Sequence, residues 1–131
     1  TLGEELIKPT KIYVNPILKI LNKYKTKNVI KGMAHITGGG LVENIPRILP
    51  EACAIKLERN RWDVPEIFKI IQKVGDIDNQ EMFHVFNMGI GMVLIVSKSD
   101  VKPVLDELKK SKEPGTIIGE VVKGDRIVHI V

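Results

Sequence analysis

Apolar residues recur at helical spacing in several stretches of the chain and predict amphipathic helices. The first stretch follows Asn15-Pro16, because proline suits the first turn of a helix and the apolar residues up to Tyr24 repeat along one face. The other helix starts are marked by capping residues, namely Asp63 with Glu66, Asp78 with Glu81, and Ser99. Residues 2–13 show no such period and are expected to form an irregular lead-in.

Compact apolar runs between turn residues predict strands, which lie at residues 29–36, 52–57, 92–96, 116–122 and 127–131. The run from Met92 to Val96 is apolar throughout, so we expect it at the centre of a sheet. The last two runs flank Lys123-Gly124-Asp125-Arg126 and predict a terminal hairpin. Together the elements predict an α+β fold, a layered mixed sheet with helices packed on it, rather than a doubly wound parallel sheet.

Composition narrows the class of protein. The 131 residues, 44% of them hydrophobic, suit one domain over 1–131 with a packed core. Cys53 is the single cysteine, so no internal disulfide forms and a reducing cytosol is expected. No Cys/His spacing indicates a zinc site, and no apolar run approaches the roughly 20 residues that span a bilayer. The net charge of +4 is spread along a chain with only 5% aromatic residues, which disfavours a nucleic-acid-binding face.

Three consecutive glycines, Gly38, Gly39 and Gly40, follow a predicted strand and precede a short helical stretch. Glycine lets the backbone approach a ligand closely, and a helix start presents N–H groups to an anion, so this arrangement favours a phosphate site. A plain loop, in which the glycines only adopt positive φ, is the alternative. Neither a P-loop nor GxGxxG is present. The helical stretch either breaks at Pro46 or restarts with Asn44 as a cap.

Polar residues beside the glycines are candidate ligand contacts. His35 is a candidate for a substrate contact or a proton transfer, and a structural hydrogen-bonding residue is the alternative. Arg47 lies three residues after Asn44 and would supply positive charge to the turn, unless it is an ordinary surface arginine. Glu43 would repel a phosphate, so we expect it to cap the Gly40 N–H or to bind a ligand hydroxyl.

A second candidate segment runs from Phe86 to Met92, where Asn87 lies between a short helix and an apolar strand. We expect Asn87 to point into a pocket. The alternative is that Gly89 and Gly91 serve only a bend. Five further residues are expected to be core, namely Cys53, Trp62, Phe68, Met88 and Met92.

Several separated motifs together resemble a known family. They are Leu2-Gly3-Glu4-Glu5-Leu6, Lys8-Pro9-Thr10, His35-Ile36-Thr37-Gly38-Gly39-Gly40-Leu41, Glu43-Asn44-Ile45-Pro46-Arg47, Trp62, Pro65-Glu66-Ile67-Phe68, Glu81-Met82 and Phe86-Asn87-Met88-Gly89-Ile90-Gly91-Met92. In identity and order they closely resemble phosphoribosylformylglycinamidine cyclo-ligase, the aminoimidazole ribonucleotide synthetase of purine biosynthesis. The resemblance covers the whole chain.

The resemblance implies that this chain is the C-terminal domain of a two-domain enzyme, whose N-terminal ATP-binding domain is absent. In the family, ATP phosphorylates the formyl-derived oxygen of formylglycinamidine ribonucleotide, and ring closure with loss of phosphate gives aminoimidazole ribonucleotide. ATP and Mg²⁺ are then held mainly by the missing domain, and no cofactor contact or metal ligand is expected here. The resemblance further implies that the full enzyme is a homodimer and that the isolated chain is inactive. A cytoplasmic location without a nucleic-acid or membrane partner is the expectation that the composition already gives.

Carried over position by position, the resemblance also implies site residues that line the ribonucleotide side of the cleft. His35 is the candidate catalytic residue. The candidate substrate contacts are Thr37, Gly38, Gly39, Gly40, Asn44, Arg47 and Asn87.

The residues themselves are also compatible with three other functions. The chain would also suit the C-terminal domain of a related amidine synthetase, although the match beyond the glycines favours the cyclo-ligase. A stand-alone module that binds a phosphorylated metabolite is a second alternative. An interaction domain that uses its lysine-rich helix is a third, and it would bind an acidic partner in a salt-sensitive way.

Overall fold

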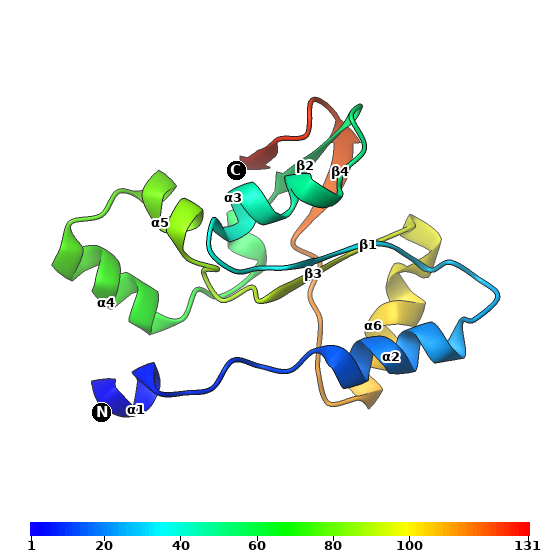
Figure 1. Ribbon diagram of the computed structural model, residues 1–131, viewed down its shortest axis with the longest axis horizontal. Helices are drawn as coiled ribbons and strands as arrows, with labels where there is room; N and C mark the ends of the chain where they lie inside the picture. Colours follow the sequence, from blue (N-terminus) through cyan, green and yellow to red (C-terminus); the bar gives the residue numbers. More distant parts are fainter.

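The computed structural model describes residues 1–131, in which helices and strands are interspersed along the chain (Figure 1). The α-helices are α1 (Leu2–Leu6), α2 (Val14–Lys23), α3 (Gly40–Asn44), α4 (Glu66–Gly75), α5 (Asn79–Val85) and α6 (Val101–Lys110). The strands are β1 (Ile30–His35), β2 (Cys53–Leu57), β3 (Met92–Val96), β4 (Gly119–Lys123) and β5 (Val128–Ile130). Short 3₁₀ turns occupy Pro46–Ile48, Arg59–Arg61 and Lys98–Asp100.

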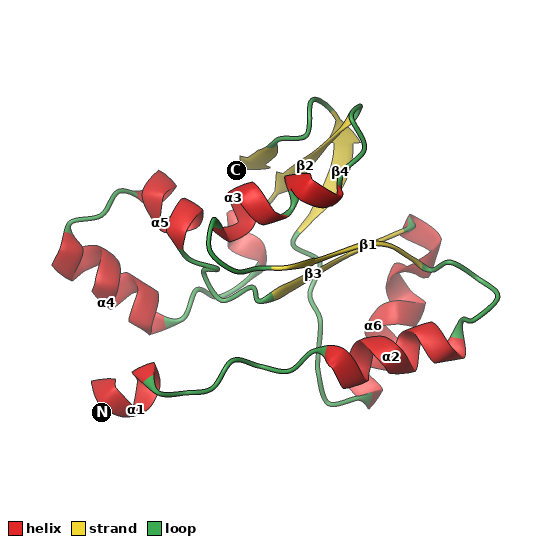
Figure 2. Ribbon diagram, viewed as in Figure 1, coloured by secondary structure: helices red, strands yellow, loops and turns green.

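The strands form two sheets, which confirms the α+β class (Figure 2). In the first sheet β1 and β3 run antiparallel, with Ala34 opposite Val93 and His35 opposite Met92. The second sheet has the order β4-β2-β5 and is mixed, because β2 is antiparallel to β4 and parallel to β5. The fold therefore holds residues far apart in sequence side by side.

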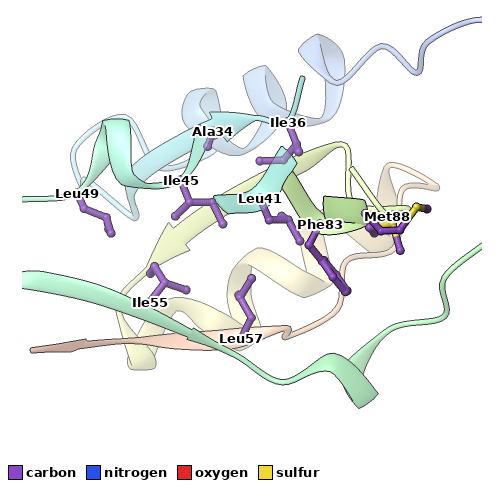
Figure 3. Packing of buried hydrophobic residues seen from close by; sticks show 10 residues of the cluster. Ala34, Ile36, Leu41, Ile45, Leu49, Ile55, Leu57, Phe83 and Met88 are labelled. Atoms are coloured by element: carbon purple, nitrogen blue, oxygen red, sulfur yellow. The ribbon is translucent and has the colours of Figure 1, made fainter. Parts of the chain in front are cut away.

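The main core lies between the two sheets (Figure 3). Ala34 and Ile36 from the β1 segment lie on one side of this core and Ile55 and Leu57 of β2 on the other, with Leu41 of α3 between them. A second cluster lies where α2 and α6 cover the β1–β3 sheet and comprises Ile20, Val29, Ile30 and Val104. Burial of these side chains, at roughly 25 cal/mol per Å² of apolar surface, stabilises the layers.

The predicted central position of the 92–96 strand is wrong, since β3 pairs only with β1. Its apolar run has a different cause. Val93 and Ile95 pack against the main core, whereas Leu94 and Val96 pack against the α2–α6 cluster. The apolar run thus indicates that both faces of the strand are covered, and it does not indicate whether the strand is paired at both edges.

The predicted terminal hairpin is also wrong, because β2 lies between β4 and β5. Ile55 is paired with Val121 on one side and with Val128 on the other. The connecting residues bind the start of β2: Gly124 N donates to Ala52 O (3.2 Å) and Arg126 N donates to Cys53 O (2.8 Å). These bonds carry the chain across the end of β2.

The helix-start predictions have mixed outcomes. Asp78 caps α5 as predicted, accepting hydrogen bonds from the N–H groups of Gln80 (2.8 Å) and Glu81 (3.0 Å). Asp63 does not cap α4, because that helix starts after Pro65. Ser99 lies inside a 3₁₀ turn and also does not cap its helix, which begins two residues later.

Two further predictions concern the ends of short helices. Residues 2–6 form α1 instead of an irregular lead-in, because Thr1 and Glu4 cap each other reciprocally. The helical stretch after the glycines breaks at Pro46, where a 3₁₀ turn begins. The Asn44 side chain does not cap that turn.

Candidate functional site

The two segments singled out in the sequence lie side by side. The glycine turn follows the end of β1, the Asn87 turn precedes the start of β3, and these two strand ends are paired. The pairing continues one step further, where Ile36 N donates to Gly91 O at 2.9 Å. On the other side of the glycine turn, α3 packs against α5. The fold therefore brings residues some fifty positions apart into one neighbourhood.

The three glycines have different reasons for lacking a side chain. Gly40 has φ +56°, and a Cβ there would lie 2.2 Å from Phe83 O, so close packing of α3 on α5 requires it. Gly39 has φ +92°, and a Cβ there would lie 2.4 Å from a Glu43 oxygen. Gly38 has neither feature, because a Cβ there would meet nothing within 4 Å. Local structure thus explains why Gly39 and Gly40 are glycines and does not explain why Gly38 is one.

Asn44 fastens the turn from inside and is only 5% exposed. Its Nδ2 donates to the carbonyl oxygens of Thr37 (3.2 Å), Gly38 (3.1 Å) and Gly40 (2.8 Å). Its Oδ1 accepts weaker bonds from Thr37 Oγ1 and from Arg47, both at 3.4 Å. The amide is thus occupied within the protein and holds the turn in shape.

The exposed rim of the turn carries His35 and Thr37, which lie on the opposite face from the buried Ala34 and Ile36. The His35 ring meets the Tyr13 ring edge-on, with 6.0 Å between centroids. Sequence reasoning did not find Tyr13, because it lies in a stretch that carries no helical or strand period. The α3 N–H groups are not all available to a ligand, since Gly40 N donates to Thr37 O (3.0 Å).

Glu43 lies between His84 and Arg47 and does not cap the Gly40 N–H. One carboxylate oxygen lies 2.9 Å from His84 Nε2, and the other lies 3.5 Å from a guanidinium nitrogen of Arg47. Arg47 does lie beside the turn, and its charge is partly balanced by this carboxylate. His84 was missed in the sequence, because a histidine on an exposed helix face carries no signal by itself.

Asn87 is half-buried and organises its own turn. Its Oδ1 accepts from Gly89 N at 2.9 Å, and its carbonyl accepts from Ile90 N at 2.9 Å. Gly89 is needed there, since it has φ +93° and a Cβ would lie 2.6 Å from Pro65. The interpretation that this glycine serves a bend is therefore confirmed.

The residues predicted to be core are largely confirmed as packed. Met88 is 2% exposed, and Trp62, Phe68 and Cys53 are partly buried against the main core. Trp62 Nε1 also donates to Met88 O at 3.1 Å, which ties its ring to the second turn. Met92 is partly buried at the start of β3.

A hollow of about 350 Å³ lies beside β3, and residues 89–92 of the second candidate segment line part of it. It is bounded by β3, α6 and residues 113–121, and its walls are mainly apolar. None of the predicted site residues lines it. No group of three or more His, Cys, Asp or Glu side chains is arranged to hold a metal ion, and none of the helices has the length and hydropathy of a membrane span.

Comparisons with known proteins match nearly the whole chain. The family described as AIR synthase related protein, C-terminal domain, matches residues 1–131. A phosphoribosylformylglycinamidine cyclo-ligase of Pseudothermotoga lettingae is 51% identical over 130 residues, which are 99% of this chain and 37% of the relative. One of Bacillus cereus is 52% identical over 123 residues, 94% of this chain and 34% of the relative. The chain thus spans about a third of the length of these curated relatives.

Solved structures of a differently named protein, HypE, have a similar fold. The crystal structure of a HypE–HypF complex superposes with a TM-score of 0.68 and 26% identity, over 98% of this chain and 42% of that chain. The crystal structure of E. coli HypE, a hydrogenase maturation protein, has a TM-score of 0.63 over 89% of this chain and 35% of that chain. At 20% identity the second likeness concerns the fold alone.

Proposed function

Because the chain belongs to the family described as AIR synthase related protein, C-terminal domain, we propose that it is the substrate-side domain of a phosphoribosylformylglycinamidine cyclo-ligase. That enzyme is an ATP-dependent ligase that converts formylglycinamidine ribonucleotide to aminoimidazole ribonucleotide, ADP and phosphate. In this proposal residues 1–131 are one domain, an N-terminal domain completes the enzyme, and the whole acts as a cytoplasmic homodimer. The shared name of relatives that match nearly the whole chain supports it.

The proposal assigns ATP and Mg²⁺ mainly to the N-terminal domain. ATP bound there supplies the phosphoryl group that activates the substrate oxygen. The chain's own task is to bind and orient the ribonucleotide. A charged and phosphorylated substrate needs a polar rim and close backbone approach, which the exposed part of the glycine turn offers.

The observation that carries the proposed site is Gly38, a glycine that local packing does not require. A residue without a side chain and with open space around it suits close approach by a ligand. We therefore assign Gly38 and Thr37 to substrate contact. Gly39 and Gly40 support the turn that presents them, and Asn44 holds its shape.

The remaining assignments follow from exposure and charge. His35 is exposed at the end of β1, where its imidazole can accept or donate a proton near the bound substrate. Arg47 offers a guanidinium to an anionic group, with Glu43 and His84 holding it in place. Asn87 offers its side-chain amide from the adjacent turn.

The test is a Gly38→Asp substitution in the full-length enzyme. We expect the KM for the ribonucleotide to rise about tenfold or more, because a carboxylate at an anion contact repels the substrate. The melting temperature should stay unchanged, since the site has room for a side chain. Gly3→Asp is the matched control, as an exposed glycine on α1 away from the turn. Unchanged kinetics in Gly38→Asp would remove Gly38 from the site.

Calorimetry separates this function from a stand-alone binding module. Formylglycinamidine ribonucleotide and Mg·ATP are titrated separately into the 131-residue chain. A ligase domain whose cleft is completed by its partner domain should bind Mg·ATP negligibly, with weak ribonucleotide binding that Gly38→Asp abolishes. Tight binding of an unrelated phosphorylated metabolite with no affinity for the ribonucleotide would favour the module instead.

A further inference from the structure

The free edge of β3 borders the hollow described above. β3 pairs with β1 on one side only, and all five of its apolar residues remain partly exposed. An unpaired, apolar strand edge is a template for pairing with another chain, so natural proteins usually shorten, charge or cover it. None of the five β3 residues is charged, proline or glycine.

The position of the hollow follows from which residues line it. Side chains alternate between the two faces of a strand, so a cavity against one face touches every second residue. All five residues from Met92 to Val96 line this hollow. It therefore runs along the backbone edge of β3.

The opposite wall has the same character. β4 is the outer strand of its own sheet, and the consecutive residues Gly119, Glu120 and Val121 line the hollow together with the segment that precedes them. Val104 and Leu108 of α6 contribute further apolar surface. Ile117 is 49% exposed and Val121 is 44% exposed, although both lie in an apolar setting. The result is a slot with apolar walls between two unpaired strand edges.

We propose that this slot holds an extended, mainly apolar segment of the polypeptide that precedes the domain in the full-length protein, paired as an additional strand against β3. The proposal rests on the proposed two-domain organisation. The family is a C-terminal domain, and the chain spans 37% of a relative, so most of such a protein is polypeptide attached ahead of these residues.

Tethering favours this occupant over a separate molecule. A segment on the same chain is present at an effective concentration on the order of millimolar, without any partner being recruited. The N-terminal part of the chain already runs along the slot, since Lys11 and Tyr13 line it. Because the walls are apolar on both sides of the β3 edge, a strand with apolar residues on both of its faces fits best.

The decisive measurement is residue-resolved hydrogen exchange on the full-length protein. In an antiparallel pair, alternate amides point away from the partner strand, so a bare edge leaves them open to water. If the slot is filled, consecutive amides from Met92 to Val96 should all exchange at least roughly 100-fold slower than unprotected amides. The flanked strand β2 provides the reference for full pairing. Fast exchange at alternate β3 amides would overturn the proposal. Protection that is lost when a dimer is diluted to monomers would also overturn it, because the occupant would then be a second copy of the protein.

A second measurement compares two valine substitutions in the full-length protein. Val121→Lys places a charge in the slot, whereas Val74→Lys changes an 82% exposed valine on α4 that does not line it. If the slot is filled, the melting temperature should fall by about 5 °C or more for the first variant and by about 1 °C or less for the second. Equal shifts would count against the proposal. Neither measurement uses turnover, so an active enzyme with a bare β3 edge would refute this inference and leave the proposed function standing.

Discussion

At the scale of single residues, the glycine turn shows why neighbouring identical residues need separate explanations. Gly40 is required by the approach of α3 to the carbonyl oxygens of α5, and Gly39 by its φ of +92° and the Glu43 side chain. Gly38 is required by neither. A residue that packing leaves unexplained is the one to test for a function.

Alanine substitutions should separate these reasons. Gly40→Ala should destabilise the chain by more than about 2 kcal/mol, because the new Cβ meets backbone atoms and the residue has positive φ. Gly38→Ala should change stability by less than about 0.5 kcal/mol. Urea unfolding of both variants measures the difference. Similar losses would mean that Gly38 is also structural.

His35 provides the second test at this scale. In the full-length enzyme, His35→Ala should lower kcat by about 100-fold or more if the imidazole transfers a proton, with little loss of stability. His129→Ala, which removes another exposed histidine, is the matched control and should leave kcat unchanged. An unaltered kcat in His35→Ala would return this residue to a structural role.

At the scale of elements, the two Asp residues ahead of α4 and α5 show how similar signals differ in outcome. Asp78 and Asp63 each precede a glutamate by three residues, yet only Asp78 accepts hydrogen bonds from its helix. The conformation of Pro65 starts α4 directly, so the Asp63 carboxylate has no N–H group to bind.

This difference predicts unequal effects of alanine. Asp78→Ala should cost about 1 kcal/mol, the usual effect of losing an N-cap. Asp63→Ala should lie within about 0.5 kcal/mol of the unaltered chain. Thermal or urea unfolding checks both. A larger loss for Asp63 would mean that it does cap α4.

The contact between α2 and α6 carries a pH signature. Glu107 accepts hydrogen bonds from Lys110 (2.7 Å) and Lys23 (2.6 Å), which lower the pKa of its carboxyl group. A lowered folded-state pKa gives stability that is present above the unfolded pKa of about 4.3 and is lost as the pH falls through the folded value. Glu107→Gln should therefore be slightly less stable than the unaltered chain at pH 7.

In acid, the free energies of unfolding of Glu107→Gln and of the unaltered chain should become equal. Both lysines are substantially exposed, so the difference at pH 7 should be small and should shrink in high salt. Urea midpoints at pH 7 and well below pH 4 measure it. A difference that persists in acid would point to packing by Glu107 instead of its charge.

At the scale of the whole molecule, the proposed function makes this domain one side of a substrate cleft. The exposed rim of the glycine turn and the second turn with Asn87 are held together by the β1–β3 pairing and by α3 on α5. The proposed chemistry needs ATP held opposite this rim.

The 131-residue chain alone should therefore show no ATP-dependent conversion of formylglycinamidine ribonucleotide. The expected result is no ADP release above a blank without protein, measured at chain concentrations at which the full-length enzyme is readily assayed. A full-length enzyme of the same family is the positive control. Turnover by the purified chain would contradict the division of labour proposed here.

Local features were largely predictable from sequence. The helices at 14–23 and 66–75, the strands near 30–35 and 53–57, and the break at Pro46 all follow from periodicity and from proline and glycine. The candidate site was predictable as two segments, since glycine and asparagine mark their turns. The sequence did not predict which polar groups of these segments would form hydrogen bonds within the protein. Asn44 is the example, because its side-chain amide binds three backbone carbonyls.

The sequence by itself determined the α+β class, the glycine turn and the resemblance that gives the family, because these depend on short-range pattern and residue identity. Only the tertiary structure decided that β5 lies against β2 instead of β4, that β3 has one bare edge, and that Glu43 joins His84 to Arg47. The physical reason is that local patterns encode which faces of an element are buried. Pairing of edges and meetings of distant side chains depend on how the whole chain closes its long-range contacts.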